Sequence, residues 1–256
     1  AAAQMKTEES QAPQLMKQKS SGVSETVKTV IYALIIALGI RSFLFEPFHI
    51  PSGSMIPTLL IGDYLFVSKY SYGYSHFSFP FSPDLFAGRI FGSDPKRGDV
   101  VVFRKPTDVS VDFIKRVVGL PGDHIQMKGG ILNINGAPVV RKRIDDYLDE
   151  YGNRVARYIE TLPGGFSHVI LESRGDDGDL DNTPEYVIEP GHYFMMGDNR
   201  DDSADSRTAE VGQVPAENLI GHAQIIFFSL DSSASWWEIW KWPFAIRFGR
   251  LFDLIT

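Results

Sequence analysis

Cysteine is absent from this chain of 256 residues. Without cysteine the protein has no disulfide framework, no thiol nucleophile, no cysteine zinc site and no iron–sulfur cluster held by thiolates. Basic side chains are also in deficit, because 25 Lys and Arg stand against 32 Asp and Glu and leave a formal net charge of −7. Sequence-independent nucleic-acid binding needs a surplus of cations facing the phosphates, so we expect no nucleic-acid partner. With 43% hydrophobic and 22% charged residues, the composition is that of a folded protein.

Several catalytic motifs are missing as well. The six histidines never form HExxH and no GxSxG occurs, which argues against a metalloprotease and an α/β-hydrolase. A match to SxxK, from Ser93 to Lys96, lies in a turn-rich stretch of a chain without KTG, and we interpret it as a chance match. The acidic stretch 172–185 does not fit an EF-hand, because a loop counted from Asp177 has Asn182 where Gly is needed. We expect a solvated loop there, and no metal or cofactor.

Long hydrophobic runs are scarce, and the one that stands out covers residues 27–45 (VKTVIYALIIALGIRSFLF). A mean hydropathy of −0.10 excludes a polytopic membrane protein but not a single span. The uncharged centre, 29–40, makes about 18 Å of helix against a hydrocarbon core of roughly 30 Å, so the flanks with Lys28 and Arg41 must contribute. Apolar residues lie all round the helix, which favours an uncleaved anchor over a buried helix of a soluble domain or a cleaved signal peptide.

The charges beside this segment predict its orientation. Lys17, Lys19 and Lys28 precede the apolar centre, whereas no Lys or Arg follows Arg41 until Lys69. By the positive-inside rule, we expect the N-terminus in the cytoplasm and the rest of the chain outside the cytoplasmic (inner) membrane. The predicted parts are a cytoplasmic N-terminal tail (1–26), a transmembrane anchor (27–45) and an extracytoplasmic β-rich domain (46–256).

Short β-branched runs, punctuated by Gly, Pro and Asp, dominate the chain after the anchor. They are GDVVVFRKP (98–106), DFIKRVVGLPGD (112–123), HIQMKGG (124–130), HYFMMGD (192–198) and GHAQIIFFS (221–229). In ILNINGAPVV, the Asn135-Gly136 pair separates two alternating arms, which is the strongest short-range hairpin signal. Together these features predict a mainly β fold with antiparallel sheets.

Two aromatic stretches, 70–92 and 236–248, stand out from this background. The second contains all four tryptophans, with Lys241 and Arg247 interleaved, which is typical of a segment at a membrane surface. Core packing accounts for most aromatic clusters, so both interpretations stay open.

The stretch HIPSGSMIPTLLIGD, 49–63, is a candidate nucleophile loop. Pro51 and Pro57 fix the backbone on either side, and Gly53 permits a sharp turn and a close approach to a substrate. A serine in this loop would be held rigidly and exposed. Pro-Ser-Gly-Ser is also an ordinary turn composition, so a base must be found before such a serine is given a role.

Lys115 and Arg116 are adjacent on a predicted strand, so their side chains point to opposite faces. A lysine that faces the core loses hydration, and its pKa falls towards values at which a neutral amine accepts a serine proton. Arginine does not deprotonate and cannot act in this way. The alternative is that Lys115 is a surface residue of an edge strand.

The order of these blocks resembles that of the bacterial type I signal peptidases, which are membrane-bound Ser/Lys endopeptidases. The resemblance rests on an N-terminal anchor followed by IPSGSMIPTL, GDVVVF, DFIKRVVGLPGD and MGDNRDDSADSR (196–207). It implies Ser54 as nucleophile and Lys115 as general base, with the Ser54 N–H and the Ser52 hydroxyl as oxyanion hole. It also implies supporting roles near the site: Ser203 would hydrogen-bond Lys115, Asp205, Arg207 and Arg116 would form ion pairs, and Gly197 would allow close packing. Asp202 stands where we expect Asn in this family.

The resemblance further implies cleavage of signal peptides from exported preproteins after small residues (Ala-x-Ala), at the surface of a phospholipid bilayer. The substrate would lie extended between 48–52 and 112–115. Its expected contacts are Phe48, Ile50, Pro51, Met55, Leu59, Asp112, Phe113 and Ile114. The alternatives are a self-cleaving repressor, which would need a DNA-binding domain where the anchor lies, and a catalytically inactive membrane-tethered β domain that binds peptides.

Overall fold

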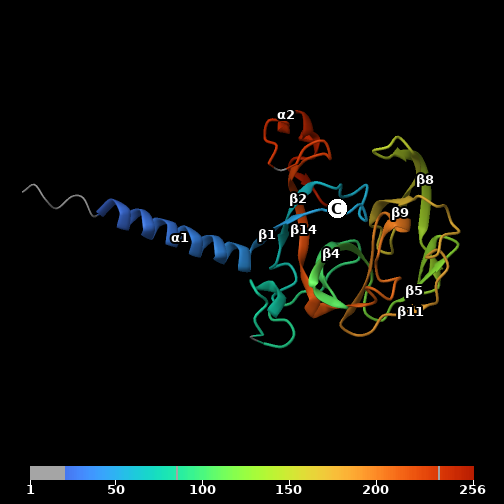
Figure 1. The fold of residues 1–256 in the computed structure, drawn as a ribbon. Coiled ribbons are helices and arrows are strands. Elements are labelled where there is room, and N and C mark those ends of the chain that lie inside the picture. Colours follow the sequence, from blue (N-terminus) through green and yellow to red (C-terminus); the bar gives the residue numbers. More distant parts are fainter. Residues whose placement is uncertain (1–20, 85, 236) are drawn as a thin grey trace, which may run out of the picture. The chain divides into compact units, whose positions relative to one another are not determined.

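The computed structural model describes residues 21–84, 86–235 and 237–256 (Figure 1). Most of the predicted tail 1–26 lies outside the described residues, and so does Trp236 of the second aromatic stretch. The chain divides into two compact units, one up to Ile40 and one from Arg41 onwards.

The described part of the first unit is made up of helix α1 (Ser21–Phe43), whose last three residues already belong to the second unit. The helix begins earlier and ends earlier than the predicted anchor. The helical segment 22–43 is long enough and apolar enough to cross a membrane. The helix stops because the next residues join the β domain: Leu44 accepts a hydrogen bond from the Lys69 N–H at 2.9 Å, and Phe45 pairs with Ser68.

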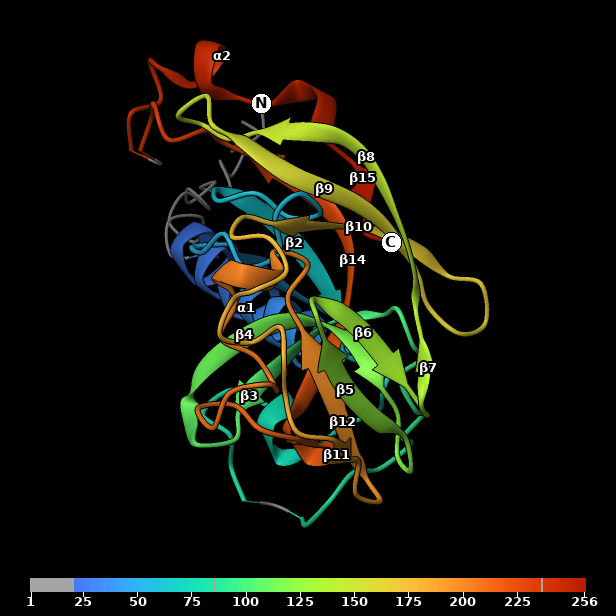
Figure 2. The same cartoon turned by 90° about the vertical axis from the view of Figure 1, so that its right-hand side faces the viewer.

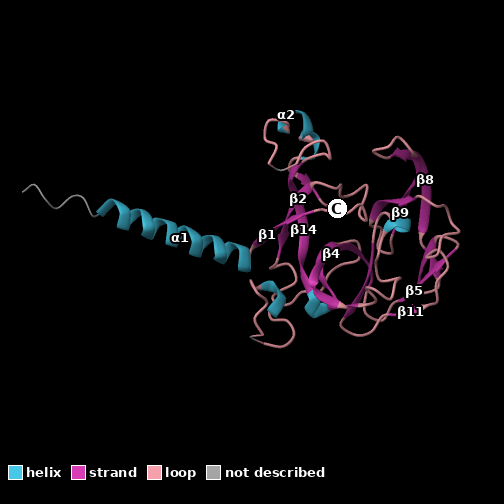
Figure 3. Ribbon diagram, viewed as in Figure 1, coloured by secondary structure: helices cyan, strands magenta, loops and turns pink. Residues whose placement is uncertain are grey.

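The largest sheet of the second unit has eight strands and is antiparallel at every pairing. Its order is β1-β2-β14-β3-β4-β12-β13, with β15 beside β14. The strands are β1 (Phe45–His49), β2 (Asp63–Ser68), β3 (Val100–Lys105), β4 (Asp108–Gly119), β12 (His192–Met196), β13 (Val214–Pro215), β14 (Leu219–Ser229) and β15 (Asp253–Leu254). The prediction of a mainly antiparallel β fold with one N-terminal apolar helix is confirmed, as the predominance of strands in Figure 3 shows.

Two smaller antiparallel sheets complete the domain (Figure 2). One has the order β10-β9-β8 and the other has the order β11-β5-β6-β7. Their strands are β5 (His124–Lys128), β6 (Ile131–Ile134), β7 (Ala137–Pro138), β8 (Val140–Leu148), β9 (Arg154–Thr161), β10 (Ser167–Glu172) and β11 (Tyr186–Val187). The predicted hairpin is confirmed, because Asn135 and Gly136, at φ of 54° and 79°, form the turn between β6 and β7.

Short helical turns connect these strands: η1 (His76–Ser78), η2 (Arg200–Asp202), η3 (Ala216–Asn218), α2 (Trp242–Ala245) and η4 (Phe248–Arg250). The segment around α2 exposes large aromatic side chains, with Trp240 exposed by 67% and Phe244 by 90%. Trp242 instead packs on Phe228, with ring centroids 5.2 Å apart. The second aromatic stretch therefore divides between core packing and exposed surface.

Candidate active site

A loop between β1 and β2 carries Ser54. The loop is closed at its base, because Ile50 N donates to Asp63 O and Gly62 N donates to Ile50 O, each at 2.9 Å. Inside it, Met55 and Leu59 are completely buried in the core cluster beneath β2. These anchors fix the loop against the sheet, but they also draw Ser54 below the surface, so the prediction that this serine is exposed is wrong.

Lys115 lies on β4, and its side chain reaches this loop. Its Nζ lies 2.6 Å from Ser54 Oγ and 3.0 Å from the Ile114 carbonyl oxygen. Ser54 is 7% exposed and Lys115 is 4% exposed, so this polar contact is shielded from solvent. Lys115 is therefore not the surface lysine of the alternative interpretation.

Burial lowers the pKa of Lys115 from 10.5 to about 8, although the charges of Asp205 and Asp198 oppose this shift. The cause is the loss of hydration, which disfavours the charged ammonium. A substantial fraction of this lysine is therefore neutral near physiological pH, which is the form that accepts a proton.

Arg116 points to the other face of β4, and it is buried too, at 1% exposure. It forms a two-pronged ion pair with Asp198, from Nε to Oδ1 at 2.8 Å and from Nη2 to Oδ2 at 2.7 Å. We predicted Arg116 among the ion pairs near the site but did not identify Asp198. Asp205 and Arg207 pair with each other instead, at 2.9 and 2.8 Å.

Ser203 does not make the hydrogen bond to Lys115 that the resemblance implies. Its Oγ is buried and has no hydrogen-bond partner among the described residues. Ser203 instead lies against Gly197, where an added Cβ would stand 2.3 Å from Ser203 Oγ and 2.6 Å from the Ser54 carbonyl oxygen. Gly197 therefore allows the close packing that we expected of it.

Asn199 also holds the serine loop, and sequence reasoning missed it. Its N–H donates to Ser54 O and its Nδ2 donates to Gly53 O, both at 3.1 Å. The residue lies between MGD and RDD in a stretch of polar residues, and nothing in its spacing distinguishes it from its neighbours.

A pocket of about 530 Å³ lies in front of the serine and the lysine. Of the predicted site residues, it is lined by Phe48, Ile50, Pro51, Ser52, Ser54, Asp112, Phe113, Ile114 and Lys115. His49, Val102, Val111, Asp202 and Ala204, which we did not predict as contacts, complete the wall. Met55 and Leu59 differ from the prediction, because both are fully buried in the core and expose no surface to a substrate.

The pocket is flanked by strand edges. β1 is the terminal strand of its sheet, and β12 pairs with β4 only from Arg116 to Gly119. Among the described residues, β1 and the part of β4 before Arg116 therefore have unpaired backbone groups on the side that faces the pocket. An extended peptide uses such groups when it adds as a further strand.

Asp202 lies between this pocket and a second one of about 270 Å³. Its carboxylate accepts hydrogen bonds from Ser173 Oγ and Arg174 Nη2, both at 3.1 Å. Asn could accept only through its single carbonyl oxygen. The acidic residue is thus accommodated by a neighbouring cation.

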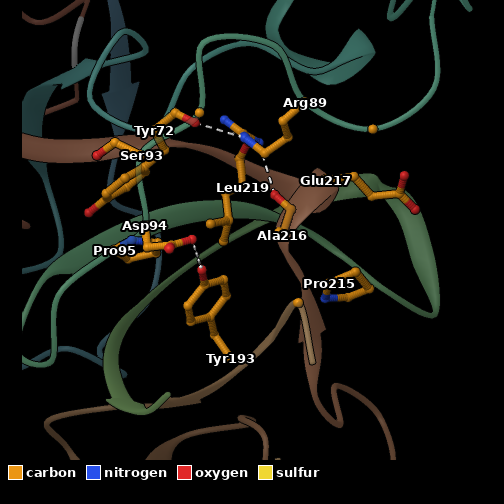
Figure 4. Close-up of a pocket in the computed structure, with 13 residues that line it drawn as sticks. Tyr72, Arg89, Ser93, Asp94, Pro95, Tyr193, Pro215, Ala216, Glu217 and Leu219 are labelled. Carbon is orange, nitrogen blue, oxygen red and sulfur yellow. Dashed lines mark hydrogen bonds between the residues drawn. The ribbon is translucent and has the colours of Figure 1, made fainter. Parts of the chain in front are cut away.

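A separate pocket of about 410 Å³, shown in Figure 4, contains no predicted site residue. Its polar groups are already paired, since Arg89 donates to the carbonyl oxygens of Tyr72 and Ala216 and Tyr193 OH donates to Asp94. We assign it no catalytic role. Of the SxxK match, Ser93 lines this pocket but Lys96 does not, and both residues are exposed.

Comparison with known proteins identifies the family. A family model described as signal peptidase, peptidase S26, matches residues 23–228. A signal peptidase I of Rickettsia canadensis is 43% identical over 244 residues, which are 88% of this chain and 91% of the relative. A signal peptidase I of Rickettsia typhi is 40% identical over 260 residues, with coverage of 93% and 97%.

The chain therefore belongs to the signal peptidase family, peptidase S26, and the predicted resemblance is confirmed. Within that family these relatives are signal peptidase I enzymes, and this chain is a peptidase of the same kind. A solved signal peptidase I from Enterococcus faecalis is 24% identical over 51% of this chain and 97% of its own, at a TM-score of 0.33, which is too low to relate the two folds.

Proposed function

We propose that this chain is a serine endopeptidase that removes N-terminal signal peptides from exported preproteins, with Ser54 as nucleophile and Lys115 as general base. The observation that carries this proposal is the 2.6 Å contact between two buried side chains that are 61 residues apart in sequence. A buried serine beside a desolvated lysine is the arrangement that activates a hydroxyl without histidine.

The reaction follows from this contact. Neutral Lys115 takes the Ser54 proton as Oγ attacks the carbonyl carbon of the scissile peptide bond. The resulting ammonium then protonates the leaving amine, and the acyl enzyme is hydrolysed by a water that Lys115 deprotonates.

The tetrahedral intermediate needs donors for its oxyanion. The Ser54 N–H donates to no other described residue, and it is therefore available for this role. The Ser52 side chain is exposed and lines the same pocket, which supports its hydroxyl as the second donor.

Specificity for small residues, in the pattern Ala-x-Ala, is part of the proposal. The apolar side chains of Ile50, Pro51 and Ile114 form the pocket wall beside the serine. Shallow apolar walls of this kind accept alanine and reject larger side chains by steric clash. The strand edges of β1 and β4 would hold the substrate backbone on either side.

We further propose that the protein is a single-pass protein of the cytoplasmic membrane, with its N-terminus in the cytoplasm and the β domain outside. Helix α1 supports the span, and the flanking lysines support the orientation. The exposed Trp240, Phe244 and Phe248 support contact of the domain with the bilayer surface, because aromatic rings favour the interface.

A preprotein cleavage assay tests the proposed function. Ser54→Ala and Lys115→Met should each reduce cleavage of an Ala-x-Ala preprotein by about 10⁴-fold or more, while circular dichroism stays unchanged. Ser93→Ala and Lys96→Met are matched controls at exposed positions and should retain full activity. Full activity of Ser54→Ala would overturn the proposal, and binding without cleavage by the wild type would favour the inactive peptide-binding domain.

A further inference from the structure

The acidic stretch 172–185 that follows β10 is exposed over most of its length, as predicted for a solvated loop, but two of its carboxylates are buried. Glu172 closes β10 and is 1% exposed, and Asp181, nine residues later, is completely buried. Asp181 is held by the Gly178 N–H, which donates to its Oδ2. Two carboxylates of one otherwise exposed stretch therefore meet below the surface.

A third carboxylate joins them from a distant part of the chain. One oxygen each of Glu172, Asp181 and Asp201 lie within 4.8 Å of one another. Two oxygens bound to one calcium ion at about 2.3–2.6 Å are separated by at most about 5 Å. The three groups are thus close enough together to share a single calcium ion.

The buried oxygens of this cluster lack hydrogen bonds. Both carboxylate oxygens of Glu172 and Oδ1 of Asp181 have no hydrogen-bond partner among the described residues. Arg141 Nη1 approaches Glu172 Oε1, but at 3.6 Å it is too far for a hydrogen bond. An unsatisfied carboxylate oxygen in the interior is costly, and proteins satisfy it with a proton, water or a cation.

The nearby cations do not neutralise the cluster, because each is paired with another carboxylate. Arg141 forms a two-pronged pair with Asp176, with contacts of 3.0 Å to both of its oxygens. Arg200 is paired with Glu160, and Arg207 is paired with Asp205. Among the described residues, the three carboxyl groups therefore have no hydrogen-bonded cation of their own.

We propose that Glu172, Asp181 and Asp201 bind a calcium ion. The ligands are hard oxygens, which calcium prefers, and they come from the end of β10, the stretch after it and η2, which suits its flexible coordination geometry. Magnesium demands shorter, nearly octahedral distances and usually keeps several of its waters, so we propose calcium as the ion.

The ion would stabilise the loop that supports Ser54. Asp201 belongs to η2, and Asn199, two residues earlier, holds the Ser54 and Gly53 carbonyl oxygens. Calcium would thus connect the end of β10 to the segment behind the nucleophile loop.

The test measures calcium binding directly, on the full chain in a nonionic detergent after treatment with EDTA. Isothermal titration should show one site for calcium, with a dissociation constant in the range of about 0.1–1 mM, and a higher unfolding temperature when calcium is added. Asp181→Asn should weaken binding by at least about tenfold, because it removes one of three anionic ligands. Asp179→Asn removes the same charge from an exposed position of the same stretch and should bind calcium as the wild type does.

The unfolding temperature measured in EDTA distinguishes a carboxylate that binds calcium from one that only stabilises the fold. Without calcium, Asp181→Asn should unfold at a temperature no lower than the wild type, since it removes a repelling charge. Glu172→Gln and Asp201→Asn repeat the binding test if one variant fails to fold. The proposal is overturned if the wild type shows no binding up to about 10 mM calcium, if Asp181→Asn binds equally well, or if magnesium binds more tightly.

Discussion

The pKa of Lys115 predicts how the rate of cleavage depends on pH. Only the neutral amine accepts the Ser54 proton, so kcat/KM should rise along a limb centred near pH 8, the pKa to which burial lowers this lysine. At pH 7 about one enzyme molecule in eleven is then active, whereas a lysine with a pKa of 10.5 would leave about one in 3,000. The lowered pKa is thus worth about 300-fold in rate at neutral pH.

The assay is cleavage of an Ala-x-Ala peptide at substrate concentrations below KM, from about pH 6 to pH 10, because kcat/KM reports the free enzyme. We expect about a tenfold gain per pH unit below pH 8 and a plateau above it. A limb near pH 10, or a rate that is independent of pH over this range, would refute the argument from burial.

Stability provides a second readout of the same pKa. The pKa of Lys115 is lower in the folded protein than in the unfolded chain. Below pH 8 the folded state therefore bears the full free-energy cost of burying the charged ammonium, and this cost disappears as pH rises towards 10.5. This cost is about 3 kcal/mol. The free energy of unfolding of the wild type should therefore rise over this interval relative to that of Lys115→Met, as measured by urea denaturation.

Three further predictions concern Gly197, Asp198 and His168. Gly197→Ala should reduce activity at least about tenfold, because the added methyl group meets the nucleophile loop, whereas Gly249→Ala, with no atom within 4 Å, should retain the wild-type rate. Asp198→Asn leaves the buried Arg116 cation without its partner and should lower the free energy of unfolding by about 3–5 kcal/mol in urea titrations; a loss below 1 kcal/mol would contradict this. Burial lowers the pKa of His168 to about 4, so as pH falls the unfolded state binds a proton before the folded state does. The free energy of unfolding of the wild type should therefore fall by about 2 kcal/mol between pH 7 and 4.5. The free energy of unfolding of a His168→Gln variant should fall less over the same interval, and an equal fall would show that His168 is not the cause.

Local patterns were enough to predict the main parts of the fold but not the central contact of the site. The Asn135-Gly136 turn follows from backbone conformation alone, whereas strand alternation places Lys115 and Arg116 on opposite faces without deciding which is buried, and the structure buries both. The pairing of Lys115 with Ser54 was predicted only with the help of the family resemblance, because alternation does not identify a partner.

Contacts between distant segments were not predictable in the same way. Asp198 pairs with Arg116 and Asn199 holds the serine loop, but neither residue has a spacing that identifies its partner. Met55 has the sequence environment of a pocket residue, yet the turn directs it into the core. The acidic stretch 172–185 is mostly exposed, as its charge predicts, but the burial of Glu172 and Asp181 within it depends on how the chain returns and could not be predicted from charge.

The distribution of the site along the chain has a consequence for biosynthesis. Ser54, Lys115 and Asn199 come from three segments that meet only when the large sheet has formed. Contacts of such long sequence separation form late in folding, because the intervening chain must first be ordered. A nascent chain that has emerged only as far as Lys115 therefore contains both reactive side chains but no segment to hold them in position. We therefore expect proteolytic activity to appear only after the domain has folded.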